Sequence, residues 1–205
     1  MPRPKQRTPE LRDRVLSVAV PLLAREGAVG FTARSVARAA DTSPPAIYEL
    51  FGDKGGLLRE IFFEGFRILG EQMDAVARSE DPRGDLIALL TAYRSFMRGN
   101  PILSEVMFSR PFADFSPGAS ELEAGSAVRT AIVEGVGRCI DGGILRGDAT
   151  DIAHVLVSLI QGLAAAENAR RLGNSPASIE RRWKLAVESL LVGLGCGSGG
   201  SHRRG

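Results

Sequence analysis

Apolar residues recur at a helical spacing along almost the whole chain, and this pattern restricts the fold more than any other feature of the sequence. Runs in which β-branched and polar residues alternate, as they do in half-buried strands, do not occur. The first segment with the helical pattern spans residues 9–25, where one face carries Leu11, Val15, Val18, Ala19, Leu22 and Leu23. The sequence therefore predicts an all-α protein of about nine helices.

The amino-acid composition indicates the cellular compartment and limits the kinds of partner that the protein can bind. The chain has 205 residues, of which 44% are hydrophobic, and its formal net charge is only +2, so any nucleic-acid surface must be local. Two cysteines, Cys139 and Cys196, are too few for a disulfide framework and fit a reducing compartment. The N-terminus is polar, and no apolar run approaches the roughly 20 residues that span a bilayer. We expect a cytoplasmic protein that does not bind membranes.

Two consecutive prolines, in the stretch DTSPPAIYELFGDK, indicate where a short helix begins. Ser43 is a suitable N-cap, and Pro44 and Pro45 then occupy the first turn, where a missing N–H group costs little. The predicted helix covers residues 44–50. A second short helix, residues 33–40 with Thr32 as its cap, precedes it across a tight turn.

The remaining helices follow from similar signals at their ends. Asp53 can cap a long helix from residue 54 to about residue 79, and Pro21 should bend the first helix or cost it a hydrogen bond. Further helices are predicted at residues 82–99, 101–108, 119–141, 151–172 and 177–194. We expect three parts: residues 1–53 with a flexible basic arm at 1–8, a larger antiparallel helical domain at 54–194, and a flexible tail at 195–205.

Two short helices joined by a turn of about three residues, with a longer helix as support, form a helix-turn-helix, whose second helix enters the DNA major groove. That spacing is common among helical proteins. The residues are more specific: GFTARSVARAADTSPPAIYELFGDKGGLL resembles the DNA-binding domain of the TetR family of transcriptional repressors, over about residues 11–62. Asp41 stands where the family usually has a turn glycine, and Leu50 where an aromatic residue or histidine is common.

The resemblance implies which side chains meet DNA. Tyr48 and Lys54 would contact phosphates, although a half-buried packing tyrosine and a solvated lysine are the alternatives. Arg34 matches a position where some family members contact a base, and phosphate contact or solvent exposure is as plausible. The prolines of the second short helix offer bases only apolar contact, as to thymine methyls. The predicted DNA-contacting residues are Thr32, Arg34, Ser43, Pro44, Pro45, Ala46, Tyr48 and Lys54. Basic residues between 1 and 14 either add phosphate contacts or form a solvated end.

Residues 54–194 resemble, more weakly, the ligand-binding and dimerisation domain of the same family. The segments AYRSFMRGNPILSEVMFSRPF and AIVEGVGRCIDGGILRGDATDIAHVLVSLIQGL carry this likeness, with Gln161 where a histidine is often found. It implies a small apolar or amphipathic effector, although ordinary core packing explains the same side chains. The predicted pocket residues are Phe62, Phe66, Tyr93, Met97, Met107, Phe108 and Gln161.

The last predicted helix carries a broad apolar stripe that could pair across a two-fold axis. The predicted dimer-interface residues are Trp183, Val187, Leu190 and Leu191. An ordinary core within one subunit is the alternative.

No arrangement of residues suggests an enzyme. His154 and His202 are isolated, there is no metal-binding spacing, and no Gly-rich phosphate loop is present. We expect no metal, no cofactor and no catalysis. The sequence favours a homodimeric repressor that binds double-stranded operator DNA and is released by an effector. The alternative is a helical small-molecule carrier or sensor without DNA binding, since the second short helix has few groups that read bases.

Overall fold

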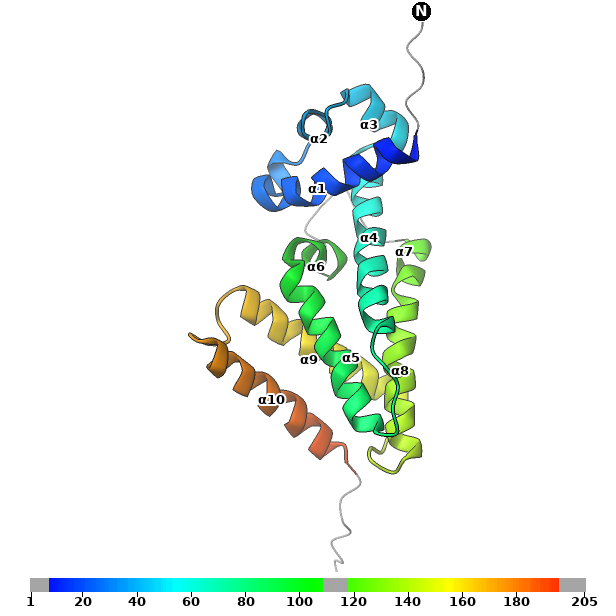
Figure 1. The fold of residues 1–205 in the computed structure, drawn as a ribbon, viewed down its shortest axis with the longest axis vertical. Coiled ribbons are helices and arrows are strands. Elements are labelled where there is room, and N and C mark those ends of the chain that lie inside the picture. Colours follow the sequence, from blue (N-terminus) through cyan, green and yellow to red (C-terminus); the bar gives the residue numbers. More distant parts are fainter. Residues whose placement is uncertain (1–7, 109–117, 196–205) are drawn as a thin grey trace, which may run out of the picture. The chain divides into compact units, whose positions relative to one another are not determined.

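The computed structural model describes residues 8–108 and 118–195, and within these ranges it is all-α, as predicted. It contains ten helices there (Figure 1) and one isolated pairing, between Leu145 and Gly195, but no strand. The tenth helix arises because the predicted segment 119–141 is divided at Gly125, into α7 (Ala119–Ala124) and α8 (Ser126–Asp141). The predicted loop that precedes α7 and the basic residues before residue 8 lie outside the described residues.

Contacts group the chain into two compact units. The first unit is Met1–Ile68 with Asn100–Gly125, and the second is Leu69–Gly99 with Ser126–Gly205. The start of α4 (Lys54–Asp74) and both α6 (Pro101–Phe108) and α7 therefore belong with the N-terminal helices. The functional division that the sequence predicts at residue 53 is a different division, and it stays a prediction.

The first unit is built around α1 (Pro9–Gly30), which continues through Pro21 and extends beyond the predicted end at residue 25. Its regular geometry is interrupted at Gly27, where φ is 65°, a left-handed conformation that suits glycine. Helix α2 (Ala33–Ala39) packs on α1, and α3 (Pro44–Phe51) packs on α2. The buried apolar residues of these helices and of the start of α4 include Leu11, Val15, Ala19, Leu22, Leu23, Phe31, Val36, Ala37, Ile47, Phe51, Leu57 and Leu58.

The second unit consists of α5 (Pro82–Gly99), α8, α9 (Ala149–Asn168) and α10 (Pro176–Gly193), after the last turn of α4. Helices α5, α8 and α9 pack against one another, and α10 packs on α9. Gly135 permits the close approach of α5 and α8, because a Cβ there would lie 3.2 Å from Leu89 Cδ1. The core of this unit includes Leu86, Leu90, Phe96, Ile132, Val136, Leu156 and Ile160.

Helix α9 corrects one expectation from the sequence. It is 20 residues long, and its most apolar stretch of 18 residues has a mean hydropathy of 1.4, so by length and composition alone it could cross a membrane. The expectation that no apolar run approaches this length was therefore wrong. One face of α9 is buried in the second unit through Ile152, Leu156 and Ile160. Only 28% of the apolar stretch is buried within the chain, however.

Candidate functional site

The start of α2 and the turn that follows it are held by short-range hydrogen bonds, of which the Thr32 cap was predicted from the sequence. The Thr32 hydroxyl caps α2 by accepting a hydrogen bond from the Ser35 backbone N–H at 3.1 Å. In return, the Ser35 hydroxyl accepts a hydrogen bond from the Thr32 backbone N–H at 2.9 Å. In the turn, the Thr42 N–H donates to the Ala37 carbonyl at 2.9 Å. Asp41 has a φ of 50°, which is the left-handed conformation that a family turn glycine would adopt.

Helix α3 begins at the two prolines, as predicted. Ser43 is its N-cap, and Pro44 and Pro45 fill its first turn. Ile47 and Phe51 are buried, so the rest of the helix surface faces outward. The helix ends at Gly52, whose φ of 77° stops the helical path one residue before Asp53. Asp53 then accepts from the Gly56 N–H at 2.7 Å and so caps α4.

All eight predicted DNA-contacting residues lie on the surface of the first unit, at the start of α2, on α3 or at the start of α4. Arg34, Pro45 and Tyr48 are exposed, and 53% of Tyr48 is accessible to solvent. The Tyr48 value favours an outward-facing hydroxyl over the packing alternative. Pro44, Ala46 and Lys54 are half-exposed. This surface is called the α2–α3 surface below.

Other side chains hold the α2–α3 surface in place, and sequence reasoning did not find them. Arg14 Nε donates to the Ala40 carbonyl at the end of α2 at 3.0 Å, and Arg12 pairs with Glu60 of α4. These two arginines belong to the basic segment considered for phosphate contact, and here they bind within the first unit. The adjacent Arg59 pairs with Glu121 of α7, whose carboxylate is almost wholly buried. No local pattern in the sequence relates these partners.

The predicted pocket residues separate between the two units. In the first unit, Phe66 lies between Phe62 and Phe108, with ring centroids 4.9 Å and 5.9 Å away. Met107 lies against Gly65, where an added Cβ would come within 2.4 Å of its Sδ. Helices α4 and α6 therefore approach closely, and these aromatic side chains pack in a continuous cluster.

In the second unit, the two polar residues predicted for the pocket bond each other. Gln161 Nε2 donates to the Tyr93 hydroxyl at 2.8 Å, joining α9 to α5. Burial raises the pKa of Tyr93 to about 12, and the bond from Gln161 opposes this change. Nearby, Asn168 Nδ2 donates to the Met97 carbonyl at 3.2 Å. The two residues that the sequence selected for their polar groups are thus each other's partners.

The predicted dimer residues are mostly covered by their own chain. Trp183, Val187 and Leu191 are buried in the second unit, whereas Leu190 is half-exposed. Burial of the first three therefore requires no second subunit, as the alternative of an internal core anticipated. The exposed apolar residues of α10 are Leu185 and Val192.

Around Trp183 lies a charged cluster that sequence reasoning missed, the Arg94 cluster, formed by Arg94, Glu167, Glu180 and Trp183. Arg94 Nε donates to Glu167 at 3.1 Å and its Nη1 to Glu180 at 2.7 Å. The Trp183 indole N–H donates to Glu167 at 2.8 Å, and the Arg94 guanidinium lies 4.3 Å from the ring centroid of Trp183. The bond from Arg94 holds the pKa of Glu180 below its usual value.

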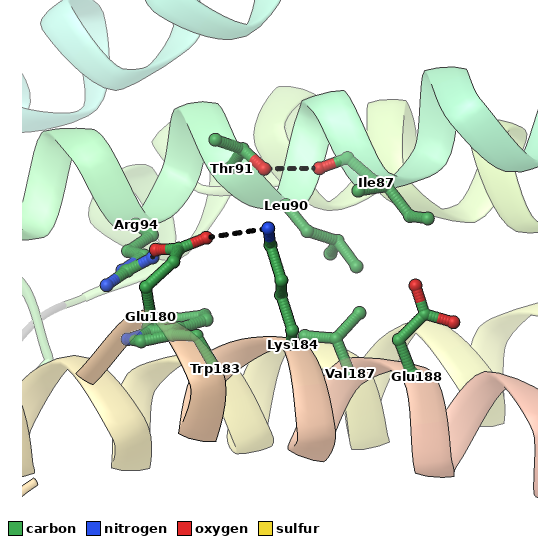
Figure 2. A pocket seen from close by; sticks show the side chains of 9 residues that line it. All are labelled: Ile87, Leu90, Thr91, Arg94, Glu180, Trp183, Lys184, Val187 and Glu188. Carbon is green, nitrogen blue, oxygen red and sulfur yellow. Dashed lines mark hydrogen bonds and ion pairs between the residues drawn. The ribbon is translucent and has the colours of Figure 1, made fainter. Parts of the chain in front are cut away.

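The Arg94 cluster closes one end of a groove between α5 and α10 (Figure 2), with a cavity volume of about 120 Å³. Leu90, Val187 and Trp183 form much of its apolar lining, and Lys184 extends from α10 beside Glu180. A second hollow of similar volume lies at the end of α4, beside Asp85 and Arg138. Neither of these two hollows is lined by a predicted pocket residue. In the described part of the chain, no group of three or more His, Cys, Asp or Glu side chains could hold a metal ion.

Comparisons with known proteins agree with this geometry. Residues 15–61 match the model of the bacterial regulatory proteins of the tetR family, and residues 86–190 match a tetracyclin repressor-like C-terminal domain. No curated protein matches the chain.

Three solved structures illustrate the likeness in fold. A protein with unknown function from Rhodococcus sp. RHA1 is 26% identical, with a TM-score of 0.79 over 95% of this chain and 100% of that one. The TetR family transcriptional regulator PfmR from Thermus thermophilus is 20% identical, with a TM-score of 0.70 over 90% and 100%. A TetR variant from Acinetobacter baumannii AYE in complex with minocycline is 16% identical, with a TM-score of 0.62 over 87% and 93%.

The two family models together cover both the α2–α3 surface and most of the second unit. The chain is therefore a helix-turn-helix DNA-binding transcription regulator, and it belongs to the tetR family of bacterial regulatory proteins.

Proposed function

We propose that this regulator is a homodimeric repressor, which acts on operator DNA in the cytoplasm and is released by a small apolar or amphipathic effector. The observation that carries the DNA-binding part is the α2–α3 surface, where Arg34 and Tyr48 are exposed on helices whose other faces are buried. Arg34 can pair with guanine or phosphate, and the Tyr48 hydroxyl can donate to phosphate. Lys54, in the first turn of α4, adds a cation where the helix dipole also attracts phosphate.

The dimer proposal is supported by α9, which is apolar but largely uncovered. Val155, Ser158, Gly162 and Ala165 are exposed and follow one another at spacings of three and four residues, so they share one face. Their small side chains would allow a second helix to approach closely. A two-fold pair of subunits that buried this face would remove the exposed apolar surface from water. Leu185 and Val192 of α10 are further apolar residues available to a partner.

The effector proposal is supported by the tyrosine–glutamine pair of the second unit. Tyr93 is buried in an apolar core and Gln161 is half-exposed beside it, and an effector that displaced one of the two polar groups could hydrogen-bond the other. The aromatic cluster of the first unit contributes the remaining predicted pocket residues, Phe62, Phe66, Met107 and Phe108. A tenfold loss of operator affinity requires about 1.4 kcal/mol of coupling between effector and DNA, and the coupling is reciprocal.

A mobility-shift experiment with the DNA that flanks the gene tests the repressor proposal most directly. We expect a complex that forms at nanomolar to micromolar protein and weakens as salt is raised. Compounds of a panel of small apolar and amphipathic molecules are then titrated with and without that DNA. An effector should bind more weakly to the DNA-bound protein. Equal affinity in both titrations for every compound that binds would contradict the release mechanism.

The dimer is tested with a matched pair of exposed valines. Val155→Glu places a charge on the uncovered face of α9 and should give monomers in sedimentation, because a buried charge without a partner is costly. Val29→Glu, on α1, is the control, because Val29 is 94% exposed and lies on another element. We expect the control to sediment as the native protein does. A native protein that is monomeric at micromolar concentration would rule out the dimer.

A further inference from the structure

The N-terminal turn of α3 offers the DNA bases no backbone hydrogen-bond donor. Pro44 and Pro45 have no N–H group. The next N–H, of Ala46, points back at the cap residue Ser43, with its carbonyl oxygen at 3.0 Å and its hydroxyl oxygen at 3.4 Å. A helix that approached the major groove with this end would therefore contact bases through side chains alone.

The side chains of the outward face are also poor in donors. Pro45 is exposed and Pro44 and Ala46 are half-exposed, and all three are apolar. The Glu49 carboxylate is exposed and can only accept. The Tyr48 hydroxyl is the one side-chain donor among the exposed residues of the described α3, Pro44–Phe51.

The chemistry of the major groove indicates what such a face can distinguish. Guanine presents two acceptors there, and adenine an acceptor beside a donor, so both purines are read well only by side chains that donate. Thymine presents the only apolar group of the groove, its C5-methyl. We propose that α3 selects its operator chiefly through contact of Pro44, Pro45 and Ala46 with thymine methyl groups. This proposal rests on the proposed operator binding and names the bases that are read.

The size of such contacts constrains the operator. Covering one methyl group is worth at most about a fourfold change in affinity. A bidentate arginine–guanine pair is worth about fivefold to 150-fold. Several thymines on α3 are therefore needed to equal one arginine contact from α2. The operator half-site is expected to be rich in thymine opposite α3, with a guanine only where Arg34 reaches a base.

Replacing thymine by deoxyuridine tests the proposal, because it removes the methyl group and leaves every hydrogen-bonding group unchanged. The full-length protein first selects duplexes from a random pool at fixed salt. The selected duplex is then compared with a copy in which the half-site thymines are deoxyuridines. We expect the affinity to fall by up to about fourfold for each contacted methyl. The same replacement in the flanking DNA is the control and should change nothing.

The Lys54→Ala variant separates base reading from phosphate anchoring. It should bind both duplexes more weakly while the ratio between their affinities stays the same, since phosphates are identical in the two. Equal affinities of the native protein for the thymine and deoxyuridine duplexes would overturn the thymine-methyl readout and leave DNA binding intact. A pool that shows no enrichment at all would overturn operator binding itself, and the readout with it.

Discussion

Two arginines, one in each compact unit, have opposite surroundings: one side chain is exposed, and the other is buried and bonded. Arg34 is exposed on α2, and its side chain forms no ion pair or hydrogen bond within the described part of the chain. Arg94 of the second unit is only 9% exposed, and it is bonded by Glu167 and Glu180 and stacked on Trp183. An arginine whose charge is balanced inside the fold positions helices, whereas an exposed arginine remains available to an anion from outside. The residue type alone does not decide between the two roles.

The largest expected effect concerns the buried arginine. Arg94→Met removes the cation but keeps a long apolar side chain, so Glu167 is left buried without this partner. We expect a loss of about 1.5–3 kcal/mol in the free energy of unfolding, because Glu167 loses one charged partner but keeps Arg98 at 2.9 Å and the Trp183 indole N–H. Denaturant unfolding measures it. Lys184→Ala is the control, since Lys184 is 72% exposed and 3.9 Å from Glu180, and such a pair contributes about 0–1 kcal/mol. A similarly small loss of stability in both variants would show that the buried arginine does not hold the helices together.

The exposed arginine should show the reverse behaviour. Arg34→Ala should change the free energy of unfolding by less than about 0.5 kcal/mol, as surface substitutions usually do. If Arg34 pairs with guanine, the variant should lose about 1–3 kcal/mol of discrimination at one base pair. Binding to the selected duplex and to single-base variants of it measures this loss. A uniform loss on all duplexes would assign Arg34 to phosphate instead.

The sequence predicts the parts of this structure that local chemistry determines. Thr32, Ser43 and Asp53 each cap the helix that follows, and their partners lie within three residues. The end of α4 could not be predicted in this way. Val76 continues the apolar spacing, but the chain leaves the helix after Asp74, and Ser79 then bonds the Asp85 carboxylate through its N–H and hydroxyl at 2.8 and 2.7 Å. The end of α4 is thus followed by a contact with the first turn of the next helix, which the apolar spacing of α4 does not reveal.

The charged clusters were missed for a related reason. Arg94 lies 73 residues from Glu167 and 86 residues from Glu180, so no spacing in the sequence connects them. The same applies to Arg59 and Glu121. In contrast, Tyr93 and Gln161 were singled out because a polar group in an apolar stripe needs a partner, and each proved to be the partner of the other. Polar exceptions in an apolar pattern identify residues, but only the fold identifies the pairs.

A smaller effect is expected for Lys54, the proposed phosphate contact at the start of α4. Lys54→Ala should weaken binding to all duplexes alike and should reduce the slope of log affinity against log salt by about 0.9. Titrations at several salt concentrations measure the slope. An effect confined to one base pair would mean that Lys54 contacts a base, which is the role considered above for Arg34.

A pH-dependent effect concerns Asp85 at the start of α5, where Arg138 bonds its carboxylate at 2.7 Å. Bonds from the Ser79 backbone N–H, the Ser79 hydroxyl and Arg138 lower the pKa of Asp85 from 3.8 to about 2. A carboxyl group whose pKa is lowered on folding stabilises the fold above its unfolded pKa, and this stabilisation is lost as the pH falls toward the folded pKa. Asp85→Asn should therefore be less stable than the native protein above about pH 4, and the difference should shrink toward about pH 2. A difference that stays the same across this range would show that the charge of Asp85 is not involved.

The paired prolines at the start of α3 also affect the entropy of recognition. A helix of eight residues would be marginal by itself, because the first turn must be ordered before any bond repays it. Pro44 and Pro45 hold φ near about −65° whether or not the rest of the chain is folded, so the unfolded ensemble is already restricted there. If α3 enters a DNA groove, its first turn therefore has little backbone freedom left to lose. Apolar contacts that are individually weak can then contribute almost undiminished to the affinity.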